Sequence, residues 1–80
     1  MATEQTWVIG SIKKNGLSEI RVAVDQYKGK TYVDVRTYYL NDRDEMAPTK
    51  KGVALHSLED VDQVISFLQT ARGKMAEVTA

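Results

Sequence analysis

Aromatic and cationic side chains gather in one stretch of this chain, Tyr27 to Leu55, which reads YKGKTYVDVRTYYLNDRDEMAPTKKGVAL. It holds all four tyrosines of the chain, with lysines and arginines close to them. Surfaces that bind a single nucleic-acid strand pair aromatic rings, on which bases stack, with cations that contact phosphate; each stacked base contributes ~1–3 kcal/mol. One hypothesis is therefore that a single nucleic-acid strand lies on this stretch, although isolated tyrosines in strands more often serve packing.

Other kinds of chemistry find no support in the sequence. His56 is the only histidine and no cysteine is present, so neither a metal-ligand cluster nor a disulfide is expected. The acids Asp42, Asp44 and Glu45 lack the ligand spacing and the glycine of a calcium loop. No nucleophile-base pair and no glycine-rich phosphate loop is visible, so we expect no enzyme, no metal site and no cofactor.

Four segments rich in β-branched or alternating residues predict strands. Asn15-Gly16 predicts a tight hairpin turn because both residues accept positive φ, and Lys28-Gly29 predicts a second turn in which glycine supplies the conformation. Pro48 cannot donate to a sheet ladder, so Met46–Thr49 is expected to be irregular or at an edge. The predicted strands are Thr6–Lys14, Glu19–Tyr27, Lys30–Leu40 and Lys51–Leu55.

The second and third segments alternate between apolar and polar residues, as half-buried antiparallel strands do. Ile20, Val22 and Val24 share one face, which Val33 and Val35 continue. The opposite face carries Arg21, Ala23 and Asp25 from one segment and Tyr32, Asp34, Arg36 and Tyr38 from the next.

An amphipathic helix follows the last predicted strand. Ser57 is a good N-cap, and Leu58, Val61, Ile65 and Leu68 repeat at helical spacing. Gly73 is the expected C-terminal stop. Four strands followed by one helix predict the α+β class with an antiparallel sheet.

The chain of 80 residues predicts one domain, residues 1–80 with a core of about 6–73. A domain this small is marginally stable alone, so association with a second copy is expected. The net charge is zero, but residues 11–52 contain nine Lys or Arg against six Asp or Glu, while the helix and tail are acidic. Neither a membrane span nor a secretory signal is visible, so we expect an intracellular protein.

Three segments, EIRVAV, YKGKTYVDVR-YY and EMAPTKKGVAL, resemble the transcriptional positive cofactor 4 family of single-stranded-DNA-binding coactivators. The resemblance covers about residues 12–55 and continues in order into the helix. It implies a curved four-stranded antiparallel sheet followed by one C-terminal helix, and a homodimer whose helices help to form the interface. It also implies binding of single-stranded or melted DNA with little sequence preference and a role in transcription regulation, in the cytoplasm or nucleoid of a bacterium or the nucleus of a eukaryote.

The resemblance also assigns roles to individual residues. Tyr27 stands where an aromatic ring stacks on a base, and Tyr39 at an aromatic position of the binding strand. The basic positions are Lys28, Lys30, Arg36, Lys50 and Lys51. Three departures imply weaker binding than in a strongly basic relative: Ala47 where lysine is common, Tyr39 where tryptophan is frequent, and Asp25 where relatives can be basic.

Several interpretations stay open. Strict alternation places Tyr39 opposite Arg36, so both face DNA only if the strand twists, bulges or ends near them. Trp7 fits core or dimer packing better than a stacking platform. The alternative function is a protein-interaction module that recruits transcription components through the helix or a sheet edge, and RNA remains a candidate ligand because no contact to a 2′-hydroxyl is identifiable. Weaker candidates for nucleic-acid binding are Arg21, Tyr32, Tyr38, Lys13 and Lys14.

Overall fold

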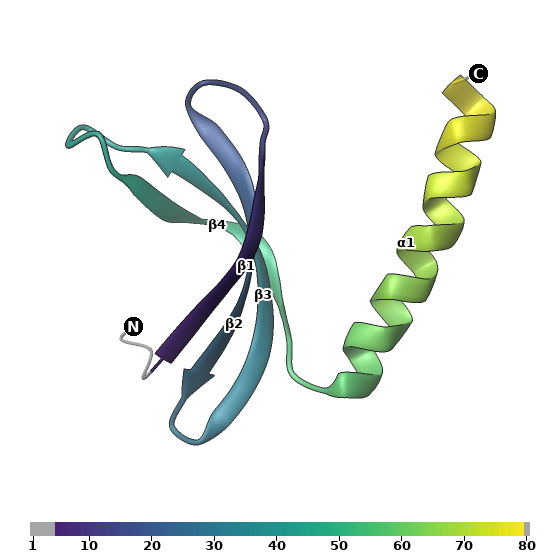
Figure 1. Ribbon diagram of the computed structural model, residues 1–80, viewed down its shortest axis with the longest axis horizontal. Helices are drawn as coiled ribbons and strands as arrows, with labels where there is room; N and C mark the ends of the chain where they lie inside the picture. Colours follow the sequence, from purple (N-terminus) through teal and green to yellow (C-terminus); the bar gives the residue numbers. More distant parts are fainter. Residues whose placement is uncertain (1–4, 80) are drawn as a thin grey trace.

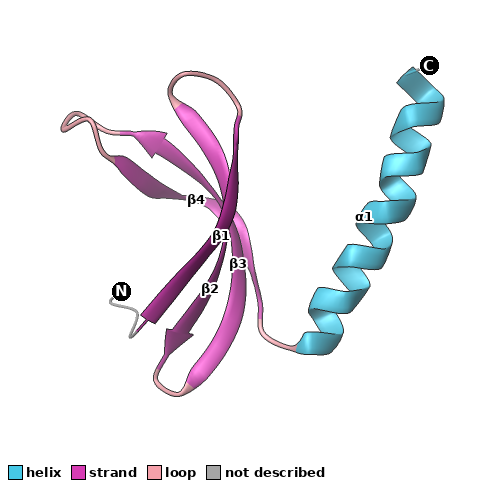
Figure 2. Ribbon diagram, viewed as in Figure 1, coloured by secondary structure: helices cyan, strands magenta, loops and turns pink. Residues whose placement is uncertain are grey.

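The computed structural model describes residues 5–79, which form four β-strands followed by one α-helix. The strands pair antiparallel in one sheet with the order β1-β2-β3-β4, so each strand lies beside its neighbours in the chain (Figures 1 and 2). The predicted α+β class and architecture are confirmed. The elements are β1 (Gln5–Lys13), β2 (Ser18–Tyr27), β3 (Lys30–Leu40), β4 (Met46–Leu55) and α1 (Leu58–Thr79).

The turn between β2 and β3 consists of Lys28 and Gly29, as predicted. Their φ angles are 51° and 76°, and a type I′ hairpin turn requires positive φ at both central positions. Tyr27 and Lys30 are the last paired residues on either side. Because the β2–β3 register continues without a shift from this pair to the pair Ser18–Tyr39, the turn fixes which side chains share a face.

The turn between β1 and β2 differs from the prediction of a tight Asn15-Gly16 hairpin. Neither residue has positive φ. The Asn15 side chain organises a wider loop instead: its Oδ1 accepts hydrogen bonds from the backbone N–H groups of Leu17 at 2.8 Å and Ser18 at 3.0 Å. Asparagine commonly caps its own backbone in this way, and here that preference overrides the two-residue turn.

The strand β4 begins at Met46 and passes through Pro48, so the prediction of a short strand starting at Lys51 was wrong. Pro48 is tolerated because β4 is an edge strand with a local irregularity. Three β4 residues, Thr49 to Lys51, lie opposite the single β3 residue Thr37. The Thr49 hydroxyl donates to the Thr37 carbonyl at 2.7 Å and holds this bulge in place.

Both outer strands carry irregularities, and the sheet curves strongly (Figure 1). In β1 the register shifts between Val8 and Gly10, which leaves Ile9 as the extra residue. Extra residues bend a strand and increase its twist, and these bulges flank the regular β2–β3 pair on both sides. The curvature therefore has its origin in β1 and β4, while β2 and β3 supply an uninterrupted ladder.

The two faces of the sheet separate apolar from polar residues, as the alternation predicts. One row across all four strands consists of Trp7, Val24, Val33 and Leu55, on what we call the apolar face. The polar face contains a row formed by Ser11, Arg21, Arg36 and Gly52, flanked by rows that contain Asp34 and Tyr38.

In most sheets the apolar face is the buried one, but in the described part of this chain the buried residues lie on the polar face. The four buried residues, Glu19, Ala23, Asp25 and Asp34, all belong to the polar face. On the apolar face Trp7 is 43% exposed and Val53 52% exposed. Contiguous exposed apolar surface is typical of interaction sites.

The helix α1 leaves the end of β4 and runs beside the sheet without covering it (Figure 1). The Ser57 hydroxyl accepts a hydrogen bond from the backbone N–H of Asp60 at 3.0 Å, which confirms the predicted N-cap. The helix continues through Gly73, so the predicted stop there was wrong. None of the described residues of α1 is buried, and Phe67 is 68% exposed. No helix in the described part of the chain is long and apolar enough to span a membrane.

We expect Gly52→Ala to destabilise the fold by roughly 1–3 kcal/mol, the usual cost of overpacking. A Cβ at Gly52 would lie 2.8 Å from the Val35 carbonyl oxygen and 2.9 Å from Arg36 Cα, backbone atoms that cannot turn aside. Gly73→Ala is the matched control: it meets open space in the helix, and alanine should add about 0.5–1 kcal/mol of stability there. Urea unfolding followed by circular dichroism, at one fixed protein concentration, measures both. A Gly52→Ala midpoint equal to that of the parent contradicts the close approach.

Candidate nucleic-acid interface

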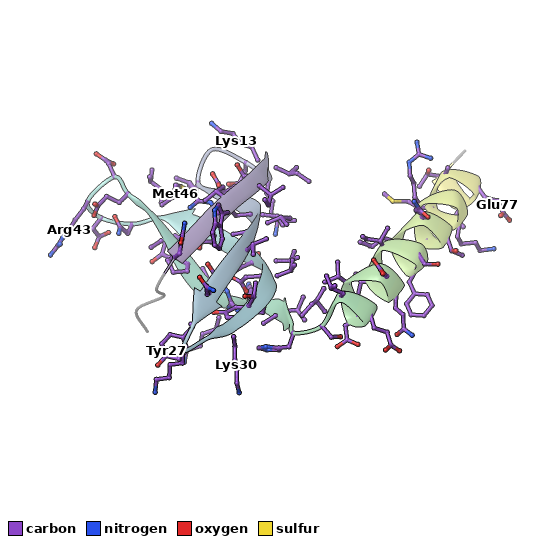
Figure 3. All side chains as sticks on the ribbon, turned by 60° about the horizontal axis from the view of Figure 1, so that its bottom comes forward. Lys13, Tyr27, Lys30, Arg43, Met46 and Glu77 are labelled. Atoms are coloured by element: carbon purple, nitrogen blue, oxygen red, sulfur yellow. The ribbon has the colours of Figure 1, made fainter. Side chains whose placement is uncertain are left out.

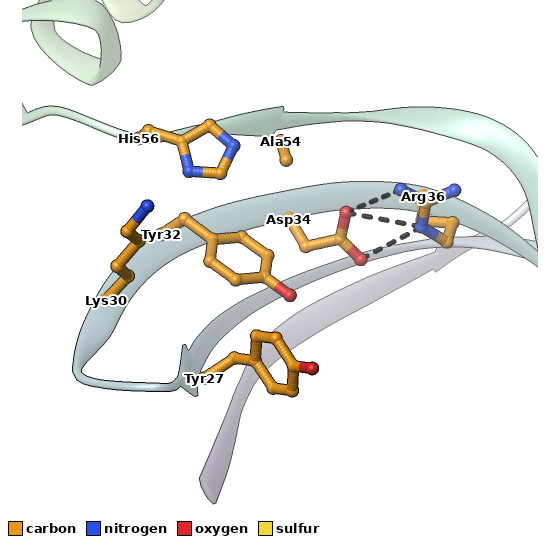
Figure 4. A pocket seen from close by; sticks show the side chains of 7 residues that line it. All are labelled: Tyr27, Lys30, Tyr32, Asp34, Arg36, Ala54 and His56. Atoms are coloured by element: carbon orange, nitrogen blue, oxygen red, sulfur yellow. Dashed lines mark hydrogen bonds and ion pairs between the residues drawn. The ribbon is translucent and has the colours of Figure 1, made fainter. Parts of the chain in front are cut away.

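The polar face is hollowed near the β2–β3 turn, and the hollow has a volume of about 360 Å³. That volume lies within the roughly 300–1,000 Å³ typical of ligand sites. Figure 4 shows the rings of Tyr27 and Tyr32, the carboxylate of Asp34 and the guanidinium of Arg36 along this hollow. Its lining comes from β2, β3 and β4 and their ends: Tyr27, Lys30, Tyr32, Asp34, Arg36, Ala54 and His56.

The register explains why these residues meet. Asp25 pairs with Tyr32, and Ala23 pairs with Asp34, so small or short side chains of β2 lie beside the longer ones of β3. On the other side Ala54 pairs with Asp34, and the close approach at Gly52 leaves the Arg36 side chain free to extend over β4. Small residues on both neighbouring strands thus make room for the hollow.

Arg36 is held by its neighbours through four hydrogen bonds. Its Nε donates to Asp34 Oδ1 at 3.2 Å and Oδ2 at 3.1 Å, and its Nη2 donates to Oδ1 at 3.0 Å. Its Nη1 donates to the Thr49 carbonyl at 2.8 Å. The hydrogen bonds that Arg36 donates to the Asp34 carboxylate raise the pKa of Arg36 above its usual value, so the guanidinium stays charged. The charge is therefore paired within the face rather than free.

A second arginine-carboxylate pair lies beside the first. Arg21 is the cross-strand partner of Arg36, and its Nε and Nη2 each lie 3.1 Å from Glu19 Oε2. The Arg21 guanidinium carbon also lies 4.1 Å from the centre of the Tyr38 ring, which is a cation–π contact. Arg21 and Tyr38, both weaker candidates from the sequence, thus extend the polar face away from the hollow.

Tyr32 is held between acids and a histidine. Its ring centre lies 5.1 Å from that of His56, at a tilt of 36°. Loss of hydration raises the pKa of the Tyr32 hydroxyl, and the charges of Asp25 and Asp34 raise it further, so the hydroxyl remains a proton donor at neutral pH. The contact with the His56 ring occupies one side of the Tyr32 ring.

Exposed lysines lie around the polar face, at the hairpin loops and at the β4 bulge. Lys28 and Lys30 are exposed at the β2–β3 turn, with Lys28 Nζ 5.4 Å from the centre of the Tyr27 ring. Lys50 and Lys51 are exposed in the β4 bulge, next to the Thr49 carbonyl that holds Arg36. No ion pair among residues 5–79 involves the sheet lysines, which we call the rim lysines: Lys13, Lys14, Lys28, Lys30, Lys50 and Lys51. Figure 3 shows how far Lys13 and Lys30 project from opposite ends of the sheet.

The structure brings most of the sequence candidates to one surface and leaves one aside. Tyr27, Lys30, Tyr32 and Arg36 line a single hollow. Tyr39 alternates onto the apolar face with Val33 and Val35 and is 50% exposed, and β3 has no irregularity against β2 that would turn it. Trp7 also lies on the apolar face and is 43% exposed, so it is not a core residue of the single chain.

Sequence reasoning missed two members of the site. His56 was considered only as a metal ligand; it is exposed, contacts Tyr32 and lines the hollow. No signal in the sequence indicated this contact, because His56 reaches Tyr32 through the β4 register that pairs Ala54 with Asp34, and that register depends on the β4 bulge. Asp34 was seen as a polar-face residue, but its ion pair with Arg36 was not predicted.

Solved structures with the same fold come from bacterial and phage proteins. A PC4 homologue from Burkholderia pseudomallei is 29% identical with a TM-score of 0.77 in its orthorhombic crystal form, covering 90% of this chain and 96% of its own. Its tetragonal form gives a TM-score of 0.78 at the same identity, covering 85% and 98%. A bacteriophage T5 homologue of the eukaryotic coactivator PC4, implicated in recombination-dependent DNA replication, shares the fold at 22% identity, a TM-score of 0.60 and coverage of 95% and 96%.

A protein-family model also matches the sequence of this chain. The model described as Transcriptional Coactivator p15 (PC4) matches residues 14–66, which include β2, β3, β4 and the first turns of α1. That family is a non-enzymatic, DNA-binding family. Since the match spans well over half of its residues, this chain belongs to the PC4 family of transcriptional coactivators.

Proposed function

We propose that this protein binds single-stranded or melted DNA on the polar face of its sheet and acts as a regulator or coactivator of transcription. The observation that carries the proposal is the hollow of about 360 Å³, where tyrosine rings lie beside hydrogen-bonding groups and the rim lysines lie at the ends of the same face. Proteins that bind single strands with little sequence preference combine these two kinds of group. Membership of a DNA-binding family supports the same conclusion.

Each part of the face takes a separate role in this proposal. Bases stack on Tyr27 and approach Tyr32 in the hollow, while phosphates contact the exposed amines of Lys28 and Lys30 and of Lys50 and Lys51. The paired Arg21 and Arg36, with Tyr38, continue the surface, and Lys13 and Lys14 lie at its far end. Tyr39 lies on the other face and is left outside this contact surface.

A second copy of the chain is part of the proposal. The apolar face is open, and the helix carries Ile65 at 49% and Leu68 at 63% exposure. Apolar area of this kind contributes roughly 25 cal/mol per Å² when it is buried, which a small domain needs. Because these surfaces lie away from the polar face, a homodimer formed through them leaves both DNA-binding faces accessible.

We expect labelled single-stranded DNA to bind with an affinity that falls as salt rises. On a single strand the logarithm of the association constant falls with the logarithm of salt by about 0.7 per phosphate neutralised. Contacts from four lysines, Lys28, Lys30, Lys50 and Lys51, therefore predict a slope of about −2.8. Fluorescence anisotropy at five salt concentrations measures it, with intact duplex and single-stranded RNA of the same sequence as comparisons.

Equal affinity for duplex and single strand argues against stacking, because bases in a duplex cannot reach the rings. Binding to neither form removes the proposed function. If the protein captures a protein partner that excess oligonucleotide does not displace, the interaction-module alternative gains the stronger support.

Two variants locate the binding surface. Tyr27→Ala should cost ~1–3 kcal/mol of binding free energy through one lost stacking contact, with little change in salt slope. The double variant Lys28→Ala with Lys30→Ala should instead make the slope shallower by about 1.4, or 0.7 for each lysine. Lys74→Ala is the control, since Lys74 lies on the exposed helix in an ion pair with Glu77. Anisotropy and circular dichroism together separate lost binding from unfolding; parent-like binding by both variants places the DNA elsewhere.

The dimer is tested by light scattering during size exclusion. At micromolar concentration the mass should be about twice the 9.0 kDa of one chain. Ile65→Asp, which places a charge in the apolar stripe of the helix, should lower that mass, whereas Gln69→Asp at an exposed polar position should not. A parent protein that elutes at the mass of one chain contradicts the dimer.

A further inference from the structure

Two arginines at the centre of the polar face carry the same local arrangement. Each is preceded by a carboxylate two residues earlier on the same strand, Glu19 before Arg21 and Asp34 before Arg36. The arginines are direct cross-strand partners, so the two ion pairs lie side by side. The carboxylates are the more deeply placed members, with side chains 11% and 10% exposed against 25% and 24% for the arginines.

Such a pair presents no net charge to an approaching phosphate. The salt-dependent part of nucleic-acid binding comes from net cations that replace counterions along the strand. A guanidinium that is already neutralised by a carboxylate at 3.0 Å displaces few of them. The rim lysines, which have no ion-pair partner among residues 5–79, retain that capacity. The same face thus contains a neutral centre and a positive rim.

We propose that Asp34 lowers the affinity of this protein for single-stranded DNA by neutralising Arg36, and that Glu19 does the same to Arg21. The inference rests on the proposed function and adds to it a built-in limit on binding strength. Phosphates then follow the lysines, while the centre of the face is left to bases, which need hydrogen bonds and stacking rather than net charge.

The alternative role for Asp34 is to hold the guanidinium in its binding position, but Asp34 is not the only residue that anchors Arg36. Arg36 also donates to the Thr49 carbonyl at 2.8 Å. An asparagine at position 34 keeps an oxygen that can accept from Nε or Nη2, so Asp34→Asn removes the charge while retaining a hydrogen bond. The orientation of Arg36 should therefore survive a substitution that releases its charge.

The experiment compares salt slopes of single-stranded-DNA binding for the parent, Asp34→Asn and the double variant Asp34→Asn with Arg36→Gln. Asp34→Asn should steepen the slope by about 0.7, the value of one additional neutralised phosphate. Its affinity at moderate salt should rise on the order of fivefold, which corresponds to one exposed ion pair. In the double variant the slope should return to that of the parent, although affinity falls with the lost guanidinium contacts.

Two further variants make the result specific. Glu19→Gln repeats the test on the neighbouring pair and keeps the proposal testable if Asp34→Asn fails to fold. Asp25→Asn is the matched control, because Asp25 is an equally buried carboxylate of the same face whose Oδ1 accepts from the Thr6 hydroxyl at 2.7 Å rather than from an arginine. It removes one negative charge without releasing a guanidinium, so its slope should equal that of the parent.

The results of these binding measurements distinguish failure of this inference from failure of the proposed DNA-binding function. A parent that does not bind single-stranded DNA overturns both. A parent that binds, with Asp34→Asn and Glu19→Gln giving unchanged or shallower slopes, overturns only the inference and makes the carboxylates positioning residues. An equal steepening in Asp25→Asn also overturns it, because the effect then follows total charge and not release of an arginine.

Discussion

The register between β2 and β3 is the constraint on which the rest of the molecule depends. The two-residue turn at Lys28 and Gly29 sets it, and the ladder continues unbroken to Tyr39. A shift by one residue would exchange the two faces of either strand, placing valines where Asp34 and Arg36 now lie. The hollow, both ion pairs and the open apolar face all follow from this one alignment.

The same alignment produces a sheet whose polar face, within a single chain, holds the buried residues. Curvature covers Glu19, Asp25 and Asp34 on the polar face, where hydrogen bonds and ion pairs offset the cost of burying carboxylates. The valines of the other face and the helix stripe stay accessible within one chain. In the homodimer that we propose, hydrophobic stabilisation, which normally comes from the interior of a domain, would come largely from the second copy.

The sequence predicted several features that depend on neighbours in the chain, although the Asn15-Gly16 loop is wider than the expected tight turn. Strand alternation, the Lys28-Gly29 turn and the Ser57 cap are local, and all three were confirmed. Gly73 did not end the helix, because glycine within a helix costs only about 1 kcal/mol relative to alanine and helical residues follow it. The β4 bulge could not be predicted, since it depends on how Thr49 meets Thr37 across the sheet. Within the site, the i, i+2 spacing of Asp34 and Arg36 placed them on one face, but their ion pair depends on side-chain conformations that spacing does not determine.

The zero net charge of the chain is a poor guide to what the polar face offers a polyanion. An overall balance argues against nucleic-acid binding only if the charges are mixed evenly over the surface. Here Arg21 and Arg36 are neutralised by Glu19 and Asp34 inside the face, and further acids lie in α1, which runs beside the sheet. The rim lysines remain outside those ion pairs, at the two hairpin loops and the β4 bulge of the sheet. A formally neutral protein can therefore present a locally positive rim, because the pairing of its arginines and the placement of its acids remove opposing charge from where a phosphate would lie.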